Sequence, residues 1–187
     1  MVTRRIVTGH SAQSKAVFAS DTQIAADTVR GFPGLEFLRL WGADQLPNFP
    51  DSGSASSYKN YFPPLGGFRF LILTFPPSQA QRLTAEERAA AYVDLERVAP
   101  GLGAHMEPNN PGMHTSDTID FGYVISGSIW LELDDGAQKE LHAGDTFVQN
   151  GTRHAWRNKS SEPCKILVVV IGAHREPSGV SLVRAHR

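Results

Sequence analysis

The stretch MHTSDTIDFGYVISG (Met113–Gly127) begins with polar residues and ends in a strand-like pattern. Further along the chain, GTRHAWRN (Gly151–Asn158) places a second histidine before another strand-like segment. Histidines beside strands bind metals in some proteins and line the walls of pockets in others. The two stretches therefore predict a metal site, a metal site that has lost ligands, or the polar wall of a barrel.

The chain around these stretches consists of short apolar runs separated by turn residues. Between Asp120 and Ala173 the runs are YVISG, SIWLELDDG, KELHAG, DTFVQNG, HAWRN and CKILVVVIGA. Turn residues recur about every six to twelve positions, which is the spacing of an all-β sandwich or barrel rather than of alternating strands and helices. We therefore expect an all-β fold.

The first part of the chain is expected to add strands and one helix. The pattern predicts a hairpin over Arg4–Ser20 and strands over Leu35–Trp41 and Gly66–Pro77. Thr84 followed by Glu87 has the spacing of a capping box, so a helix is expected to begin there and to pack one face on its neighbours. The residues of that apolar face are Ala91, Leu95 and Val98.

A long irregular segment, Asp44–Pro64, separates two of the predicted strands. It is rich in Pro, Ser and Gly, and it carries Tyr58, Tyr61 and Phe62 near its end. Loops of this length are uncommon in a compact domain and are often functional. We expect this loop to act as a lid over a binding site.

The totals favour one globular domain over residues 1–187, with strands, loop and helix over 1–110 and a motif-bearing barrel core over 111–175. With 41% hydrophobic residues, 20% charged residues and a net charge of −1, nothing indicates a nucleic-acid groove or a polybasic membrane patch. No apolar run reaches the roughly 18 residues of a membrane span, and no signal peptide is visible. We therefore expect a cytoplasmic protein with no nucleic-acid or membrane partner.

The spacing of His114, Asp120 and Gly127 resembles the first motif of the cupin superfamily. That motif reads Gly, five residues, His-x-His, three or four residues, Glu, six residues, Gly. Here three residues separate Ser116 from Asp120, and six separate Asp120 from Gly127. The motif is degenerate in this chain, because Ser116 takes the place of the second His and Asp120 takes the place of Glu.

The later stretch resembles the second motif of the same family, which reads Gly, five residues, Pro-x-Gly, two residues, His, three residues, Asn. The residues that fall into this frame are Gly144, Gly151, His154 and Asn158, with the turn one residue short and Asn150 near the place of the proline. The resemblance implies a small single-domain cupin of type 2. Its fold is all-β, a cupin-type jelly-roll β-barrel with the N-terminal hairpin and one α-helix packed outside.

The resemblance also implies a metal site built from both motifs. The usual ligands of the family are two His and one Glu from the first motif and one His from the second, and the residues that match are His114, Asp120 and His154. Three protein ligands hold a catalytic metal when water or substrate fills the other positions. The expected cofactor is one divalent transition metal, either Fe, Zn, Mn or Ni, with no organic cofactor. The alternative is a barrel whose site no longer holds a metal.

Strand periodicity places other residues around these three, because residues two apart on a strand share a face. The expected pocket residues are Ser116, Val124, Trp156 and Asn158. On the first strand, Phe121, Tyr123 and Ile125 then lie on the outer face, and three large apolar side chains there need a cover. Either the hairpin and helix or a second subunit supplies it, and we expect a homodimer.

The residues support hypotheses from two classes. The first is an enzyme acting on a small carbonyl or aromatic compound inside the barrel, of dioxygenase, decarboxylase, dehydratase or isomerase type. A bound metal would act as a Lewis acid or as the site for oxygen; without one, His154 and Asp120 would shuttle a proton as the catalytic pair. The second is a non-catalytic barrel that binds a small molecule and keeps a vestigial metal site.

Overall fold

Strand β11 (Cys164–Gly172) lies in the middle of the larger sheet. It pairs antiparallel with β5 (Phe68–Phe75) on one side and with β6 (Thr118–Ser126) on the other. Alternate residues of β11 are buried and the intervening ones are half-buried. A strand that is apolar on both faces must be covered on both, so β11 forms part of the inner wall of a two-layered structure.

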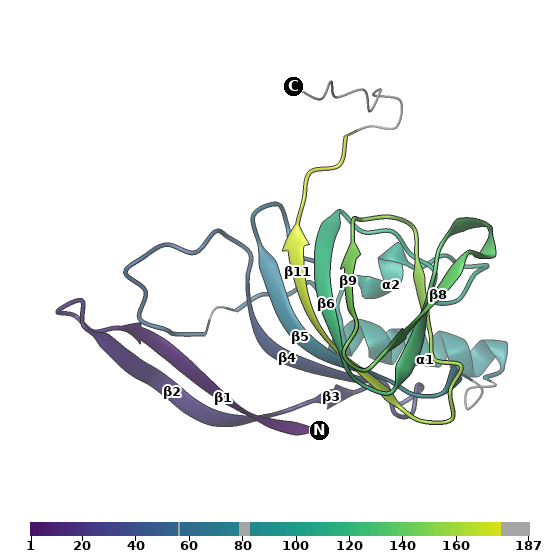
Figure 1. The fold of residues 1–187 in the computed structure, drawn as a ribbon, viewed down its shortest axis with the longest axis horizontal. Coiled ribbons are helices and arrows are strands. Elements are labelled where there is room, and N and C mark those ends of the chain that lie inside the picture. Colours follow the sequence, from purple (N-terminus) through teal and green to yellow (C-terminus); the bar gives the residue numbers. More distant parts are fainter. Residues whose placement is uncertain (56, 79–82, 177–187) are drawn as a thin grey trace.

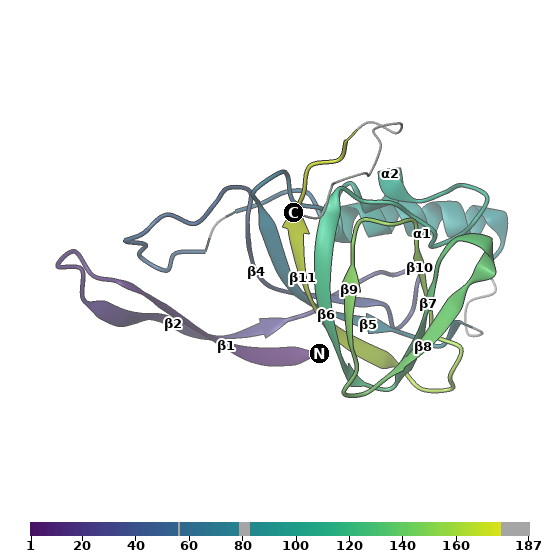
Figure 2. The same cartoon turned by 45° about the horizontal axis from the view of Figure 1, so that its top comes forward.

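The computed structural model describes residues 1–55, 57–78 and 83–176, which form an all-β jelly-roll barrel (Figure 1). One sheet has the strand order β3-β4-β5-β11-β6-β9 and a second has the order β10-β7-β8 (Figure 2). The other strands of the barrel are β3 Asp27–Thr28, β4 Glu36–Ala43, β7 Ser128–Glu132, β8 Gln138–His142, β9 Thr146–Gln149 and β10 Ala155–Arg157. The predicted fold class is confirmed.

The hydrophobic core draws its side chains from both sheets and from the helix. Its largest group of buried residues comes from β5, β6, β7, β9 and β11, and the members on these strands are Leu71, Leu73, Val124, Ile129, Phe147, Cys164, Ile166, Val168 and Val170. Gly122 is required at its position, because a Cβ added there would lie 1.9 Å from the ring of Phe147. The glycine thus lets an aromatic ring enter the barrel between β6 and β9.

Helix α1 (Ala85–Val98) begins where the capping box predicts. The backbone N–H of Glu87 donates to the hydroxyl of Thr84, and the backbone N–H of Thr84 donates to the carboxylate of Glu87. Its predicted apolar face is confirmed, since Ala91, Leu95 and Val98 are buried.

The prediction of a single helix was incomplete. A short helix α2 (Leu102–His105) follows α1, and a 3-10 turn, η2, spans Asp134–Gly136. Neither is long enough to show helical periodicity in the sequence. Among the described residues, no helix is long and apolar enough to cross a membrane.

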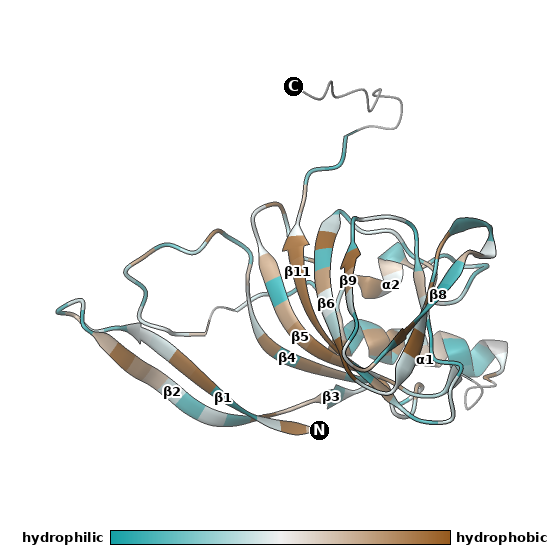
Figure 3. Ribbon diagram, viewed as in Figure 1, coloured by the Kyte–Doolittle hydropathy of each residue, from teal (hydrophilic) through white to brown (hydrophobic). Residues whose placement is uncertain are grey.

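The predicted N-terminal hairpin is confirmed as strands β1 (Val2–His10) and β2 (Ala16–Ala25). It projects away from the barrel instead of lying over the outer face of β6 (Figure 1). Its apolar residues (Figure 3) are therefore largely in solvent, and Phe18 is 81% exposed.

The outward face of β6 is apolar, and no described residue of this chain covers it. Phe121, Tyr123 and Ile125 are each more than 40% exposed, whereas Asp120 and Val124 on the opposite face are buried. The alternation expected from the sequence is therefore present, but the hairpin does not supply the cover. That a second copy of the chain covers this face stays a prediction.

Candidate functional site

The two histidines of the sequence motifs face each other across a backbone bridge. The N–H of each residue donates to the carbonyl oxygen of the other at 2.9 Å, which makes His114 and His154 an antiparallel pair. Directly paired residues carry their side chains on the same face. The ring centroids accordingly lie only 4.2 Å apart, and both side chains are buried.

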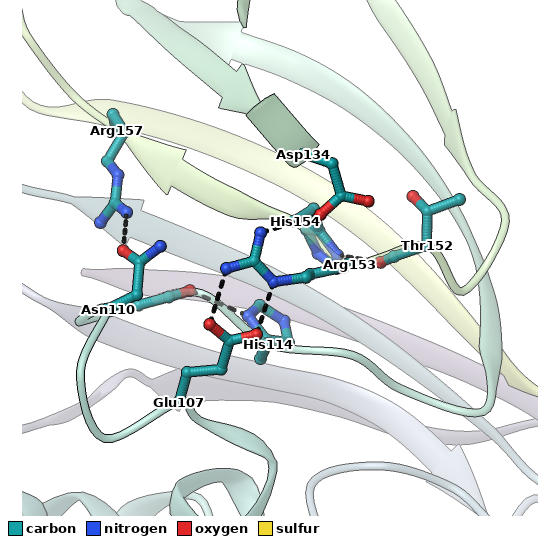
Figure 4. Close-up of polar contacts among 9 residues, drawn as sticks. Glu107, Asn110, His114, Asp134, Thr152, Arg153, His154 and Arg157 are labelled. Atoms are coloured by element: carbon teal, nitrogen blue, oxygen red, sulfur yellow. Dashed lines mark hydrogen bonds and ion pairs between the residues drawn. The ribbon is translucent and has the colours of Figure 1, made fainter. Parts of the chain in front are cut away.

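Each imidazole is oriented by a backbone carbonyl two residues before it. Nδ1 of His114 lies 3.0 Å from the carbonyl oxygen of Gly112, and Nδ1 of His154 lies 2.9 Å from that of Thr152 (Figure 4). A carbonyl only accepts hydrogen bonds, so Nδ1 carries the proton in both rings. In the neutral form, each Nε2 is therefore an unprotonated nitrogen with a lone pair.

Burial keeps both rings neutral. It lowers the pKa of His154 to about 4, with a contribution from the adjacent His114. Burial also lowers the pKa of His114, against an opposing effect of the hydrogen bond to Gly112. At neutral pH the pair therefore presents two hydrogen-bond acceptors and no positive charge.

Asp120 lies at the end of a chain of buried hydroxyls on the inner face of β6. The hydroxyl of Thr118 donates to Oδ1 of Asp120 at 2.7 Å, and it lies 2.8 Å from the hydroxyl of Ser116. Because the hydroxyl hydrogen of Thr118 goes to Asp120, Ser116 is the donor to Thr118. Burial raises the pKa of Asp120 to about 6, although the Thr118 hydrogen bond works against this.

A cavity of about 340 Å³ opens inside the barrel, and His114, Asp120 and His154 all line it. Most of its wall is apolar or aromatic, and the aromatic lining residues are Phe32, Phe37, Tyr61, Phe62, Phe75, Tyr92, Phe147 and Trp156. Small-molecule sites have this character: an apolar cavity with a few convergent polar groups. The cavity is thus the best candidate binding site in the described part of the chain.

The four residues expected to form the pocket differ in their placement. Trp156 and Asn158 line the cavity. The side chain of Asn158 has a structural role, because its amide donates to the carbonyl oxygens of Phe75 and Glu162. Neither Ser116 nor Val124 is among the lining residues of the described chain: Ser116 bonds to Thr118, and Val124 lies in the core.

The loop expected to form a lid contributes to this cavity through the end of its sequence. Tyr61 and Phe62 line the wall, and the ring of Phe62 lies 6.0 Å from that of His114. Tyr58 faces elsewhere and packs against the guanidinium of Arg69. Two of the three aromatic residues singled out in the sequence therefore reach the candidate site.

Two arginines tie the segment before His114 to the segment that carries His154 and leads into β10. Arg153 forms a two-pronged ion pair with Glu107, and Arg157 bonds to Asn110 (Figure 4). Alternation from the inward His154 places Arg153 and Arg157 on the outer face, yet Arg157 also lines the cavity. Its partners are distant in the sequence, so no local pattern could have revealed this.

The donor set for a metal is incomplete in the described residues. The two imidazoles have suitable chemistry, because each offers Nε2 while its Nδ1 is fixed by a carbonyl. No group of three or more His, Cys, Asp or Glu side chains is gathered there closely enough to hold an ion. That His114, Asp120 and His154 together hold a divalent metal therefore stays a prediction.

Comparisons with known proteins find similarity over part of the chain. Residues 97–170 match the model of the cupin domain family. Phomopsin biosynthesis cluster protein C' of Diaporthe leptostromiformis is 50% identical over 48 residues, which are 26% of this chain and 25% of that protein. The cupin-domain-containing oxidoreductase srdD of Neurospora crassa is 39% identical over 46 residues, which are 25% of this chain and 24% of that protein. Each match thus spans about a quarter of the curated relative.

A solved structure that covers more of the chain is that of the polyketide cyclase RemF from Streptomyces resistomycificus. It is 18% identical, with a TM-score of 0.44, and the match covers 82% of this chain and 77% of that one. This similarity is too distant to indicate a reaction.

We predict that Asp120→Asn stabilises the protein at neutral pH. The folded state raises the pKa of Asp120 to about 6 from an ordinary 3.8, so the folded state binds more protons between these values and loses stability as pH rises through them. Removing the carboxylate should raise the free energy of unfolding by up to about 3 kcal/mol above pH 6. Urea unfolding from pH 4 to 7 measures this, and the gain should vanish near pH 4.

The matched control is Asp117→Asn, three residues away, whose carboxylate is 62% exposed and pairs with Arg175. It should give no such gain at neutral pH. A gain for Asp120→Asn that is equally large at pH 4 and pH 7 would contradict the raised pKa.

Proposed function

We propose, from the premise that this chain belongs to the cupin superfamily, that it is an enzyme that moves a proton on a small aromatic or carbonyl compound bound inside the barrel. The observation that carries this proposal is the convergence of Asp120, His114 and His154 on one largely apolar cavity. A carboxyl group with a pKa near neutrality that shares one cavity with neutral imidazoles is suited to acid–base chemistry.

The lining of the cavity supports a flat, largely apolar substrate. Eight aromatic side chains surround a volume of about 340 Å³, which suits a compound of one or two rings better than a sugar or a nucleotide. The name of the phomopsin cluster relative places that protein in a biosynthesis cluster, and the second relative is named an oxidoreductase. These names support a biosynthetic enzyme acting on a small molecule.

Asp120 is proposed as the group that exchanges the proton. Because its pKa is about 6, it is mostly ionised at pH 7 and can accept a proton, yet it lies close enough to neutrality to return one. Thr118 occupies Oδ1, which fixes the carboxyl plane. We therefore assign the transfer to the other oxygen, Oδ2.

The two histidines are proposed to orient the substrate. With a pKa of about 4, His154 is a weak base, but its unprotonated Nε2 accepts a hydrogen bond from a substrate hydroxyl or enol. His114 offers its own Nε2 in the same way, and the centroids of the two rings lie 4.2 Å apart. In this proposal His154 contacts the reacting molecule and Asp120 moves the proton. Both residues of the predicted catalytic pair therefore keep a role, but only Asp120 transfers the proton.

A metal-dependent oxidoreductase is the second candidate function. The observation that favours it is the pair of imidazoles with Nδ1 held by carbonyls, an arrangement typical of metal ligands. A divalent metal bound there would act as a Lewis acid on a substrate oxygen. The incomplete donor set of the described residues makes this the less favoured of the two.

The proposed proton transfer predicts hydrogen exchange at carbon. With phenylpyruvate and 4-phenyl-2-butanone as probes in deuterium oxide, the protein should accelerate deuterium uptake next to the carbonyl, measured by NMR. The rate should fall tenfold for each pH unit below about 6, because protonated Asp120 is no base. Asp120→Asn should slow the exchange about 100-fold or more, and Asp117→Asn should leave it unchanged.

A protein that binds these probes without accelerating exchange would instead be the non-catalytic binding barrel. Exchange that survives in Asp120→Asn would remove that residue from the proposed role while leaving the cavity as the binding site.

Metal removal separates the two candidate functions. Because no step of the proton transfer uses a metal, protein dialysed against a chelator should retain its exchange activity. Loss of activity on chelation, with recovery on adding Fe²⁺, Zn²⁺, Mn²⁺ or Ni²⁺, would favour the metal-dependent enzyme. In that case His154→Ala should abolish the recovery, since it deletes one of the two imidazoles.

A further inference from the structure

A second cavity, of about 200 Å³, lies where the hairpin strand β1, strand β4 and the long loop meet. The residues that line it are Arg5, Arg39, Leu40, Trp41, Gly42, Ala55, Ser57 and Tyr58. None of these residues lines the cavity inside the barrel. The described lining contains two guanidinium groups and no carboxylate.

Two buried polar atoms of this lining have no hydrogen-bond partner. They are Nε of Arg5 and the hydroxyl oxygen of Tyr58, and they are the buried side-chain atoms without a partner in the described chain. Such atoms are rare in folded proteins, and each marks a place where water, an ion or a ligand belongs. That both belong to lining residues of one cavity points to one shared partner.

Arg5 is held in place by contacts that leave Nε unused. Its Nη1 donates to the carbonyl oxygen of Leu40 at 2.9 Å, and its guanidinium carbon lies 5.2 Å from the centroid of the Trp41 ring. Because these contacts fix the plane of the group, the direction of its Nε–H bond is fixed as well.

Tyr58 is held just as firmly. The guanidinium carbon of Arg69 lies 4.0 Å from its ring centroid, and Arg69 is itself fully buried. On another side the ring packs onto the backbone at Gly42, where an added Cβ would lie 2.6 Å from Cε1 of Tyr58. The phenol therefore has a fixed direction, and burial also raises its pKa, so it stays protonated and can donate.

The chemistry of these atoms defines the missing partner. A guanidinium N–H only donates, so the partner of Arg5 Nε must be an acceptor, and the Tyr58 hydroxyl can donate to the same group. Arg39 brings a second guanidinium, which is paired at 2.6 Å with Asp27 outside the lining. Arg5 forms no ion pair with a described residue, and its positive charge favours an anion over water. The volume also exceeds the roughly 30 Å³ of one water molecule.

We propose that this cavity is a binding site for a small oxyanion, a carboxylate or a phosphate group, held by Arg5 and Tyr58. One oxygen of the anion accepts from Arg5 Nε and the same or a neighbouring oxygen accepts from the Tyr58 hydroxyl. The site is separate from the proposed catalytic cavity, so its failure would leave the proposed function untouched.

The test uses inorganic phosphate and acetate as probes on the full chain, with chloride at matched ionic strength as reference. An anion that binds the folded state raises the melting temperature, and the rise with anion concentration should fit one dissociation constant. Tyr58→Phe removes one hydrogen bond to a charged group, so calorimetry should show binding weakened about tenfold or more. Arg5→Lys keeps the charge but loses the Nε donor, and it should weaken binding similarly.

The difference in melting temperature between the wild type and Tyr58→Phe should change sign when the anion is added. In chloride alone, Tyr58→Phe should melt no lower than the wild type, because it removes a buried hydroxyl that has no partner. In saturating phosphate or acetate, whichever the site prefers, the wild type should melt higher than the variant. Matched controls are Tyr123→Phe on the outer face of β6 and Arg4→Gln, the exposed neighbour of Arg5, and neither should alter binding.

Two results would overturn the proposal. If phosphate and acetate act no differently from chloride, the cavity holds only water. If Tyr58→Phe and Arg5→Lys bind the anions as tightly as the wild type, the anions bind elsewhere on the surface.

Discussion

Two backbone hydrogen bonds between His114 and His154 hold the site together. They join the loop that precedes β6 to the segment that enters β10, and so they place two motifs that lie far apart in the sequence on one wall of the barrel. The ion pair of Arg153 with Glu107 fastens the same two segments from outside. The separation of 4.2 Å between the two ring centroids follows from this pairing.

Burial then decides the protonation of the site. Moving a charged group into an apolar cavity is costly, so burial favours the neutral forms of both imidazoles and of the carboxyl group. This lowers the pKa of His154 to about 4 and raises that of Asp120 to about 6. The order of the two pKa values is thus inverted relative to free side chains. A carboxyl group that titrates near neutrality, in the same cavity as His154, whose pKa is about 4, makes acid–base chemistry the favoured function.

Local patterns predicted much of this from the sequence. Alternation on β6 placed Asp120 and Val124 inward, and the capping box at Thr84 located the helix. Contacts between distant segments were not predictable in this way. The hairpin has an ordinary strand pattern that does not say where it packs, and the hydroxyl chain from Ser116 to Asp120 uses side chains whose partners could equally have been a metal. The hydrogen bonds of Arg157 to Glu132 and Asn110 likewise join residues that lie far apart in the sequence.

The most direct test of this picture is an NMR titration of the Asp120 carboxyl carbon and the His154 ring nitrogens. Asp120 should titrate near pH 6, and His154 should stay neutral, with its proton on Nδ1, down to about pH 4. The measurement needs no substrate and no assumption about a metal. A His154 that gains its second proton near pH 6.5, together with an Asp120 that titrates near pH 4, would contradict the inverted order on which the proposed chemistry rests.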